Sequence, residues 1–202
     1  MKKTTIIGLA TLVAAALSYG QGTVNFANPG ASVSNILTLA PVPAGNQFWA
    51  ALNWLPDRPD APTTADFDAA GEAAIAKTTN FTAAGIIVGG SVRIQGLTPA
   101  GGNAWFQVRA WEHLYGDRVV NSYEEALTTP LDPSVGRPIL AGTSNIFKVD
   151  TGDPTTTPPG TPAPIYGAGK LQGFYVVPVP EPSLVGLGVL GIGALLMLRR
   201  RS

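Results

Sequence analysis

The chain has 202 residues, thirteen basic and thirteen acidic side chains, and no cysteine. This length is enough for one domain with a real core, while the lack of cysteine excludes disulfides, iron–sulfur clusters and thiol catalysis. The balanced charge leaves no basic patch to neutralise phosphates, so nucleic acid is not an expected partner.

The first twenty residues have the pattern of a secretory signal peptide. Lys2 and Lys3 precede an apolar run over 6–17, and small residues follow as far as Gly20. A short basic region, an apolar stretch and a small-residue exit are the parts of such a signal, and the run is too short to span a bilayer. We expect the secretion machinery to export the chain and signal peptidase to cleave after Gly20, with cleavage after Ser18 as the alternative.

Most of the following chain is predicted to be β-structure. Short segments alternate in polarity and are separated by Gly-Gly, Thr-Pro and Asp-Pro, which is typical of strands in sandwiches and barrels. No helical pattern is long enough for a parallel α/β sheet. The expected strands are 23–27, 48–55, 86–88, 91–97, 104–112, 145–149 and 171–177. They favour an all-β domain over residues 21–177, a β-sandwich of the Ig-like or jelly-roll type.

Two short helices and one low-complexity segment interrupt this pattern. The alanine-rich stretch 66–77 favours a helix weakened by Gly71. Ser122 and Glu125 have the spacing of a capping box, which predicts one or two turns ending before Pro130. The Thr/Pro-rich stretch 151–164 cannot build a core. It is a long loop between the last two strands or, alternatively, a stalk.

The segment 104–112 is the strongest candidate for a binding surface. Side chains alternate between the two faces of a strand, so one face carries small and apolar residues for the core. The opposite face carries Trp105, Gln107, Arg109 and Trp111. Two tryptophans flanking an arginine could form a flat carbohydrate-binding platform. Alternatively, Arg109 stacks on the two rings, or the face packs under the helix that contains Glu124 or under a second sheet, because aromatic pairs commonly stabilise sheets.

Catalytic and metal chemistry find little support in the sequence. His113 is the sole histidine, and the sequence contains neither a nucleophile elbow nor a Ser-x-x-Lys motif. We therefore expect His113 at a strand end or in a loop and assign no catalytic residue. One histidine without cysteine does not make a conventional zinc site. The acidic cluster is better explained as a solvated loop than as a calcium site, because the EF-hand spacing is absent. It comprises Asp57, Asp60, Asp66, Asp68 and Glu72. No metal or cofactor is expected.

The last residues, 178–202, form a three-part tail. Pro180-Glu181-Pro182 is followed by an uncharged segment over 183–198 and then by Arg199, Arg200 and Arg201. As a helix the segment is about 24 Å long, so it spans a bilayer only with snorkelling or local thinning. The arginines keep their end cytoplasmic, which places the body of the protein outside.

This tail resembles the PEP-CTERM sorting signal of Gram-negative bacteria. The resemblance rests on the Pro-Glu-Pro motif, the apolar segment and the arginine cluster, and it covers only residues 179–202. It implies processing near the motif by a membrane protease-transpeptidase, an exosortase. The precursor would sit in the inner membrane with its body in the periplasm, and the mature protein would reach the cell surface or the exopolysaccharide matrix.

Pieces of the body also resemble, loosely, domains found in front of this tail in other bacterial surface proteins. These pieces are 22–26, 106–111 and 122–126.

Without the two ends, eight basic side chains remain against twelve acidic ones. The sequence therefore predicts an acidic, structural, non-enzymatic exported protein, with a carbohydrate-binding module as the alternative.

Overall fold

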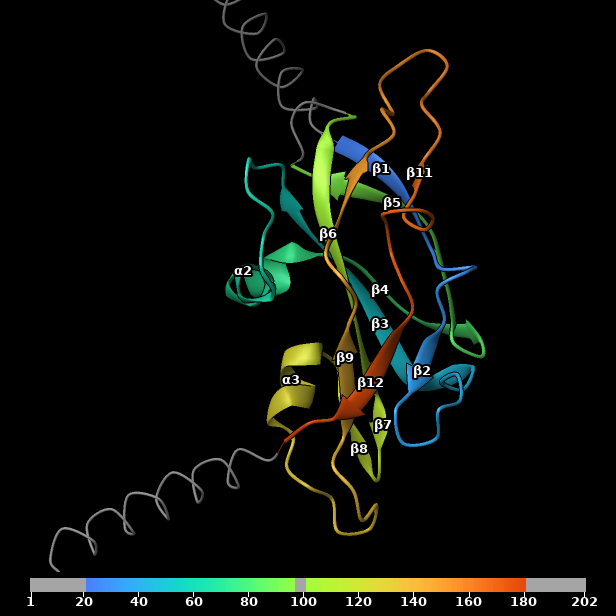
Figure 1. Cartoon of the computed structure of the whole chain (residues 1–202), viewed down its shortest axis with the longest axis vertical. Coiled ribbons are helices and arrows are strands. Elements are labelled where there is room, and N and C mark those ends of the chain that lie inside the picture. Colours follow the sequence, from blue (N-terminus) through green and yellow to red (C-terminus); the bar gives the residue numbers. More distant parts are fainter. Residues whose placement is uncertain (1–20, 97–100, 181–202) are drawn as a thin grey trace, which may run out of the picture.

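The computed structural model describes residues 21–96 and 101–180, and in them the chain is mostly β-structure (Figure 1). Two short α-helices, α2 (Thr64–Ala70) and α3 (Tyr123–Thr128), and one 3-10 turn, η1 (Gly71–Ala74), accompany the strands. The strands are β1 (Gln21–Ala27), β2 (Val33–Asn35), β3 (Gly45–Pro56), β4 (Ile75–Ala83), β5 (Ile86–Gln95), β6 (Asn103–Glu112), β7 (Leu114–Tyr115), β8 (Arg118–Val119), β9 (Leu140–Thr143), β10 (Phe147–Asp150), β11 (Ala163–Pro164) and β12 (Phe174–Pro178). The predicted mostly-β class is confirmed.

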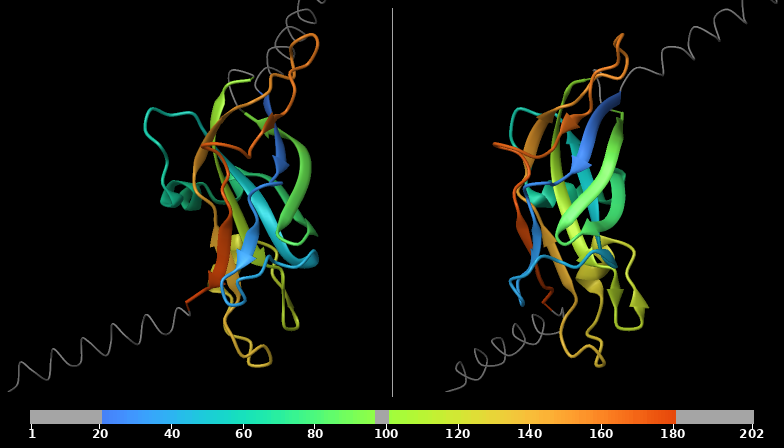
Figure 2. Two further views of the ribbon diagram at one scale, coloured as in Figure 1. Left: turned by 45° about the vertical axis from the view of Figure 1, so that its right-hand side comes forward. Right: turned by 90° about the vertical axis from the view of Figure 1, so that its right-hand side faces the viewer.

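Ten of these strands form a single mixed sheet that curls on itself. Its order is β11-β1-β5-β4-β3-β6-β9-β12-β2, and β10 pairs with β6 beside this path. Thr23 of β1 forms a bridge with Gly152, just after β10, so the two arms of the curl meet. Figure 2 shows β1 and β5 lying opposite β12 and β9 across the interior. Strands β7 and β8 form a separate small hairpin.

The main core fills the inside of the curl. On β6, Phe106, Val108 and Ala110 point inward, as their alternation predicts, and all three are fully buried. Phe26 of β1 and Val176 of β12 reach the same cluster from the two arms. A second, smaller cluster lies on the outside of β3, β6 and β9, beneath α3, and includes Trp111 and Ala126. The sheet is therefore buried on both faces at its centre.

Each expected strand overlaps an observed strand, although their bounds differ. The two expected strands 86–88 and 91–97 correspond to one strand, β5, which runs from Ile86 to Gln95 through Gly89 and Gly90. The expected helix over 66–77 is shorter: α2 ends at Gly71, whose φ of 54° lies in the left-handed region that glycine tolerates. The chain then enters β4, which pairs with β3. Pairing with β3 outweighs the helix preference of the alanines in this stretch.

The predicted capping box of α3 is present with a small shift. The Glu125 N–H donates to Ser122 Oγ at 3.0 Å, and the Glu125 carboxylate accepts from the N–H of Asn121 at 2.7 Å, one residue before the N-cap. The helix ends at Thr128, before Pro130. The Thr/Pro-rich stretch 151–164 lies between β10 and β12 and contributes the two-residue β11, which pairs with β1.

Candidate functional site: the helix-covered face of β6

Strand β6 crosses the centre of the sheet, and its outer face carries the side chains singled out by the sequence. Trp105, Gln107, Arg109 and Trp111 alternate with the inward core residues, so they all lie on the outer face. Strands β3 and β9 flank β6 around Arg109, which is in register with Ala51 and Thr143. Helix α2 precedes β4 and helix α3 follows β8, and both lie over this face (Figure 1).

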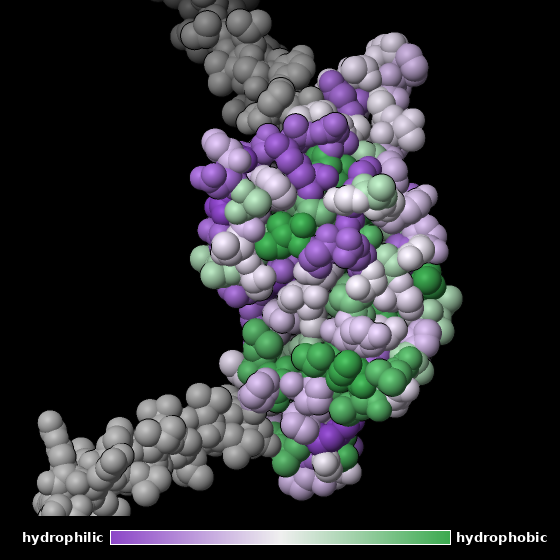
Figure 3. Space-filling view, viewed as in Figure 1, coloured by the Kyte–Doolittle hydropathy of each residue, from purple (hydrophilic) through white to green (hydrophobic). Residues whose placement is uncertain are grey.

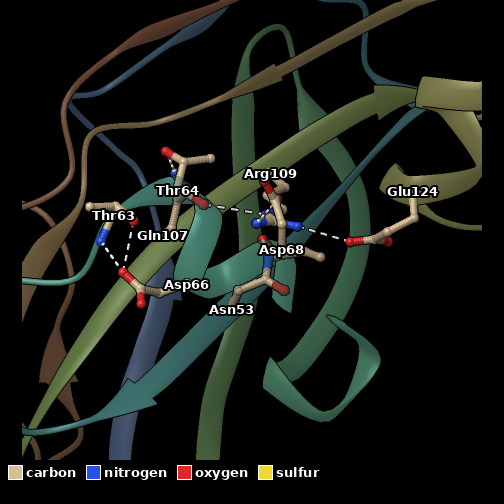
Figure 4. Close-up of polar contacts among 9 residues, drawn as sticks. Asn53, Thr63, Thr64, Asp66, Asp68, Gln107, Arg109 and Glu124 are labelled. Atoms are coloured by element: carbon tan, nitrogen blue, oxygen red, sulfur yellow. Dashed lines mark hydrogen bonds and ion pairs between the residues drawn. The ribbon is translucent and has the colours of Figure 1, made fainter. Parts of the chain in front are cut away.

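Arg109 joins β6 to both helices. Its guanidinium donates to Asp68 of α2 at 2.6 Å and to Glu124 of α3 at 2.9 Å, as Figure 4 shows. Its Nε donates to Gln107 at 3.3 Å, and the Gln107 amide in turn donates to Thr64 of α2 at 3.2 Å. Charge-assisted hydrogen bonds of this kind are about twice as strong as neutral ones. The network therefore fixes both helices against the sheet.

The expectation of an exposed tryptophan and arginine platform is wrong for most of this face. Trp111, Arg109 and Gln107 are each only 1% exposed, because the helices cover them. Trp105 is half-buried, and the Lys148 ammonium lies 5.6 Å from its ring centroid. The cation–π partner of Arg109 is Tyr123 of α3, at 5.1 Å, and neither tryptophan. The alternative prediction, a face packed under the helix that contains Glu124, is confirmed.

The space left under the helices is small. A cavity of about 20 Å³ lies between β3, β6 and α3, with Asn53, Arg109, Trp111 and Tyr123 in its wall. This volume corresponds to about one water molecule. Burial of the ring raises the pKa of Tyr123 above its usual 10.0, although the nearby Arg109 charge opposes the shift. The covered face thus has the features of a structural clamp.

His113 lies at the end of β6 and is engaged in structural contacts. Its ring stacks on Trp49 with centroids 3.9 Å apart, and its Nδ1 is 2.7 Å from the Val120 carbonyl. The same carbonyl accepts the Trp111 indole N–H at 2.9 Å. The neighbouring Glu112 is buried and forms a bidentate ion pair with Arg137, which raises the pKa of that guanidinium. These contacts hold the β7–β8 hairpin and the 130–138 loop on the sheet.

The acidic cluster is divided among separate ion pairs. Asp57 pairs with Lys148 at 2.7 Å, Asp68 with Arg109, and Asp66 with Arg58 at 2.7 Å. The Arg58 guanidinium and hydrogen bonds from Thr63 hold the pKa of Asp66 well below its usual range. Across residues 21–96 and 101–180, no group of three or more carboxylate or histidine side chains is placed to hold a metal ion.

A larger cleft opens where β4 and β5 separate. The two strands pair only near their shared turn, at Phe81 with Ile87 and Ala83 with Ile86. Beyond these pairs a cleft of about 230 Å³ lies between them, lined by Trp54, Ala73, Ile75, Ala76, Arg93 and Gln95. Sequence reasoning missed this site, because β4 was not predicted. In β3, Trp54 packs against the main core cluster and Trp49 against the second one, so the two rings lie on opposite faces of the strand.

Several predicted features lie outside the described residues. These are the signal peptide over 1–20, the apolar segment 183–198, the arginines 199–201, and Glu181 and Pro182 of the motif. Pro180 is exposed at the end of the described chain. Within the described part, no helix is long and apolar enough to cross a membrane. Comparisons with protein-family models, with curated proteins and with solved structures find no match.

Proposed function

We propose that this chain is an exported surface or extracellular-matrix protein that is sorted and processed through its C-terminal tail and has a structural, non-enzymatic role. The order of motif, apolar segment and arginines directly after the last strand carries this proposal. The precursor is held in the inner membrane with its body in the periplasm. An exosortase then processes it, and the mature form reaches the surface or the exopolysaccharide.

The boundaries of the folded body support this arrangement. Strand β1 begins at Gln21, the residue expected after signal cleavage, and pairs there with Gln95. At the other end, Val179 donates its N–H to the Ile139 carbonyl at 2.9 Å and is 9% exposed. Both ends of the described chain are thus tied into the sheet by residues that the two cleavages retain.

The buried polar groups of the body also support a structural role. Arg109, Glu112 and His113 are all used in contacts that join helices, hairpin or loop to the sheet. The curl of the sheet, with β1 and β5 opposite β9 and β12, is consistent with a sandwich of Ig-like or jelly-roll type. Domains of this kind commonly serve as robust surface modules.

The proposal is tested by expressing the full chain in a Gram-negative host that carries an exosortase. A variant with alanine at Pro180, Glu181 and Pro182 is compared with the parent, and Pro159→Ala in the exposed part of the 151–164 loop serves as a control. We expect the parent and the control in the surface or medium fraction, and the triple variant in the inner membrane. Equal distribution of all three proteins would overturn the sorting role of the motif.

A second candidate function, carbohydrate binding, is favoured by the cleft between β4 and β5 and not by the covered face. The half-buried Trp54 offers a ring face, while Arg93 and Gln95 are exposed and supply hydrogen-bond donors. Immobilised polysaccharides test it with Trp54→Ala and Arg93→Met, and with Trp105→Ala as the comparison on the other surface. If only Trp54→Ala and Arg93→Met lose retention, the result supports binding in the cleft. If none of the proteins is retained, binding of those polymers is excluded.

A further inference from the structure

The end of the body from which the tail leaves carries nearly all of its exposed large apolar side chains. In Figure 1 this end holds α3, β12, the β7–β8 hairpin, the loop after β2 and the 130–138 loop, and we call it the tail pole. Figure 3 shows apolar residues gathered on the lower part of the same face. Apart from Val88 and Tyr166, every exposed large apolar residue of the described chain belongs to these elements: Ile36, Leu37, Leu39, Leu114, Val119, Leu127, Leu131, Tyr175 and Val177.

The exposure of these side chains is large and is spread over several separate elements. Leu39 is 72% exposed, Leu37 and Val119 are each 53% exposed, and Tyr175 is 50% exposed. Single exposed apolar residues are ordinary, but a gathering of them at one end marks an interaction surface. Beside the Thr/Pro-rich loop at the opposite end, the described chain has one exposed large apolar residue, Tyr166, at 37%.

The spacer between the body and the apolar tail segment is very short. Within the described residues, Val179 is the last that hydrogen-bonds to the body, and the uncharged apolar run begins at Leu184. Even fully extended, the intervening chain reaches at most about 18 Å. The headgroup layer of a bilayer is itself about 6 Å thick. An inserted tail therefore keeps Val179 within about 12 Å of the headgroup surface.

We propose that the tail pole rests in the headgroup region of the bilayer while the tail is inserted. This inference rests on the proposed function, because it needs the 183–198 segment in the membrane. The pole combines leucine and valine with Tyr175, and tyrosine is favoured at membrane–water interfaces. The charges at this end are mixed, with Asp117 and Arg118 at the turn of the hairpin and Asp132 in the loop, so apolar contact and not attraction to anionic lipid holds the pole there.

The contact adds a second membrane signal to the inserted tail segment. An inserted segment anchors firmly, whereas a single weak apolar contact binds membranes reversibly. Cleavage near Pro180 removes the first signal, and the pole alone then releases the body. The processing motif meanwhile lies at the membrane surface, directly beneath the body.

The test uses the full chain in vesicles of phosphatidylethanolamine and phosphatidylglycerol. Because the chain has no cysteine, single cysteines can be introduced and labelled with an environment-sensitive fluorophore. Leu39→Cys and Val119→Cys report on the tail pole, and Thr156→Cys in the exposed loop at the other end is the control. Insertion of the tail is measured separately, by resistance to alkaline extraction.

With the tail inserted, we expect a lipid-headgroup quencher to reduce the fluorescence at Leu39→Cys and Val119→Cys several-fold more than at Thr156→Cys. Equal quenching at all three positions with an inserted tail would overturn the inference and leave the sorting proposal intact. The fluorophores at the tail pole could instead be shielded from water but insensitive to the lipid quencher. This result would show that a second copy or the tail itself covers the pole, and it would also overturn the inference. A tail that alkaline buffer extracts would overturn both.

Discussion

The buried guanidinium of Arg109 and its two carboxylate partners should contribute unequally to stability. Arg109 is 1% exposed, whereas the side chains of Asp68 and Glu124 are 53% and 39% exposed. Removing the arginine leaves two carboxylates on partly exposed side chains, of which Asp68 is the more exposed and Glu124 keeps one buried oxygen. Removing both carboxylates leaves a buried cation without a counter-charge. The second change should therefore be the more destabilising one.

The size of each effect follows from this difference in exposure. Breaking a buried ion pair by removing one partner costs about 3–5 kcal/mol when a charge is left behind. Asp68→Asn combined with Glu124→Gln keeps neutral acceptors near Arg109, so we expect a loss of about 3 kcal/mol, at the lower end of that range. Arg109→Met retains most of the side-chain volume and leaves charges only on partly exposed side chains, and we expect a loss of about 1–2 kcal/mol.

Urea unfolding of a chain of residues 21–180 measures both losses, because all of the contacts involved lie within this range. With a slope of about 2 kcal/mol per molar urea, the double variant should unfold about 1.5 M earlier than the parent. Arg58→Met, which breaks the more exposed pair with Asp66, is the control and should change the midpoint little. A larger loss for Arg109→Met than for the double variant would refute the reasoning.

Three further predictions concern other parts of the fold. A Cβ at Gly142 would overlap the Tyr175 carbonyl of β12, so Gly142→Ala should lower the thermal midpoint by many degrees, while Gly30→Ala, which meets open space, should not. Asn28 is fully buried and makes three hydrogen bonds, to Ala31, Gly85 and Ile87. Asn28→Ala should therefore cost about 3 kcal/mol in urea unfolding, and a loss near zero would contradict this accounting. Burial raises the pKa of Tyr123. The contribution of the neutral Tyr123 ring to stability is therefore complete below pH 10, and it is lost as the pH rises through the pKa of the folded state. Tyr123→Phe should remove a phenolate absorbance step above pH 10, and a Tyr123 step at or below pH 10 would contradict the shift.

Local alternation was sufficient to predict which way the β6 side chains point. Phe106, Val108 and Ala110 are in the core, and Arg109 and Trp111 are on the other face, as a two-residue period requires. The period contains no information about what covers each face. The covering elements are 64–70 and 123–128, whose partners of Arg109 lie 41 and 15 residues from it along the chain, so its burial depends on packing that the strand itself does not encode.

The elements that the sequence did not predict are those stabilised by their neighbours. Strand β9 (Leu140–Thr143) is four residues long and contains Gly142, yet it is held between β6 and β12. Strand β4 follows directly on an alanine-rich stretch that favours helix, and its pairing with β3 decides its conformation. The cleft beside Trp54 follows from the divergence of β4 from β5, so it could not be predicted without β4.

The role of the two ends is tested by the intact mass of the protein released from cells that carry an exosortase. The account predicts a chain that begins at Gln21 and ends close to Pro180–Pro182, without the apolar segment and the arginines. It also predicts that this chain unfolds cooperatively, because ten of its strands form one sheet around a common core. A released protein whose mass includes residues 183–202 would contradict the proposed processing.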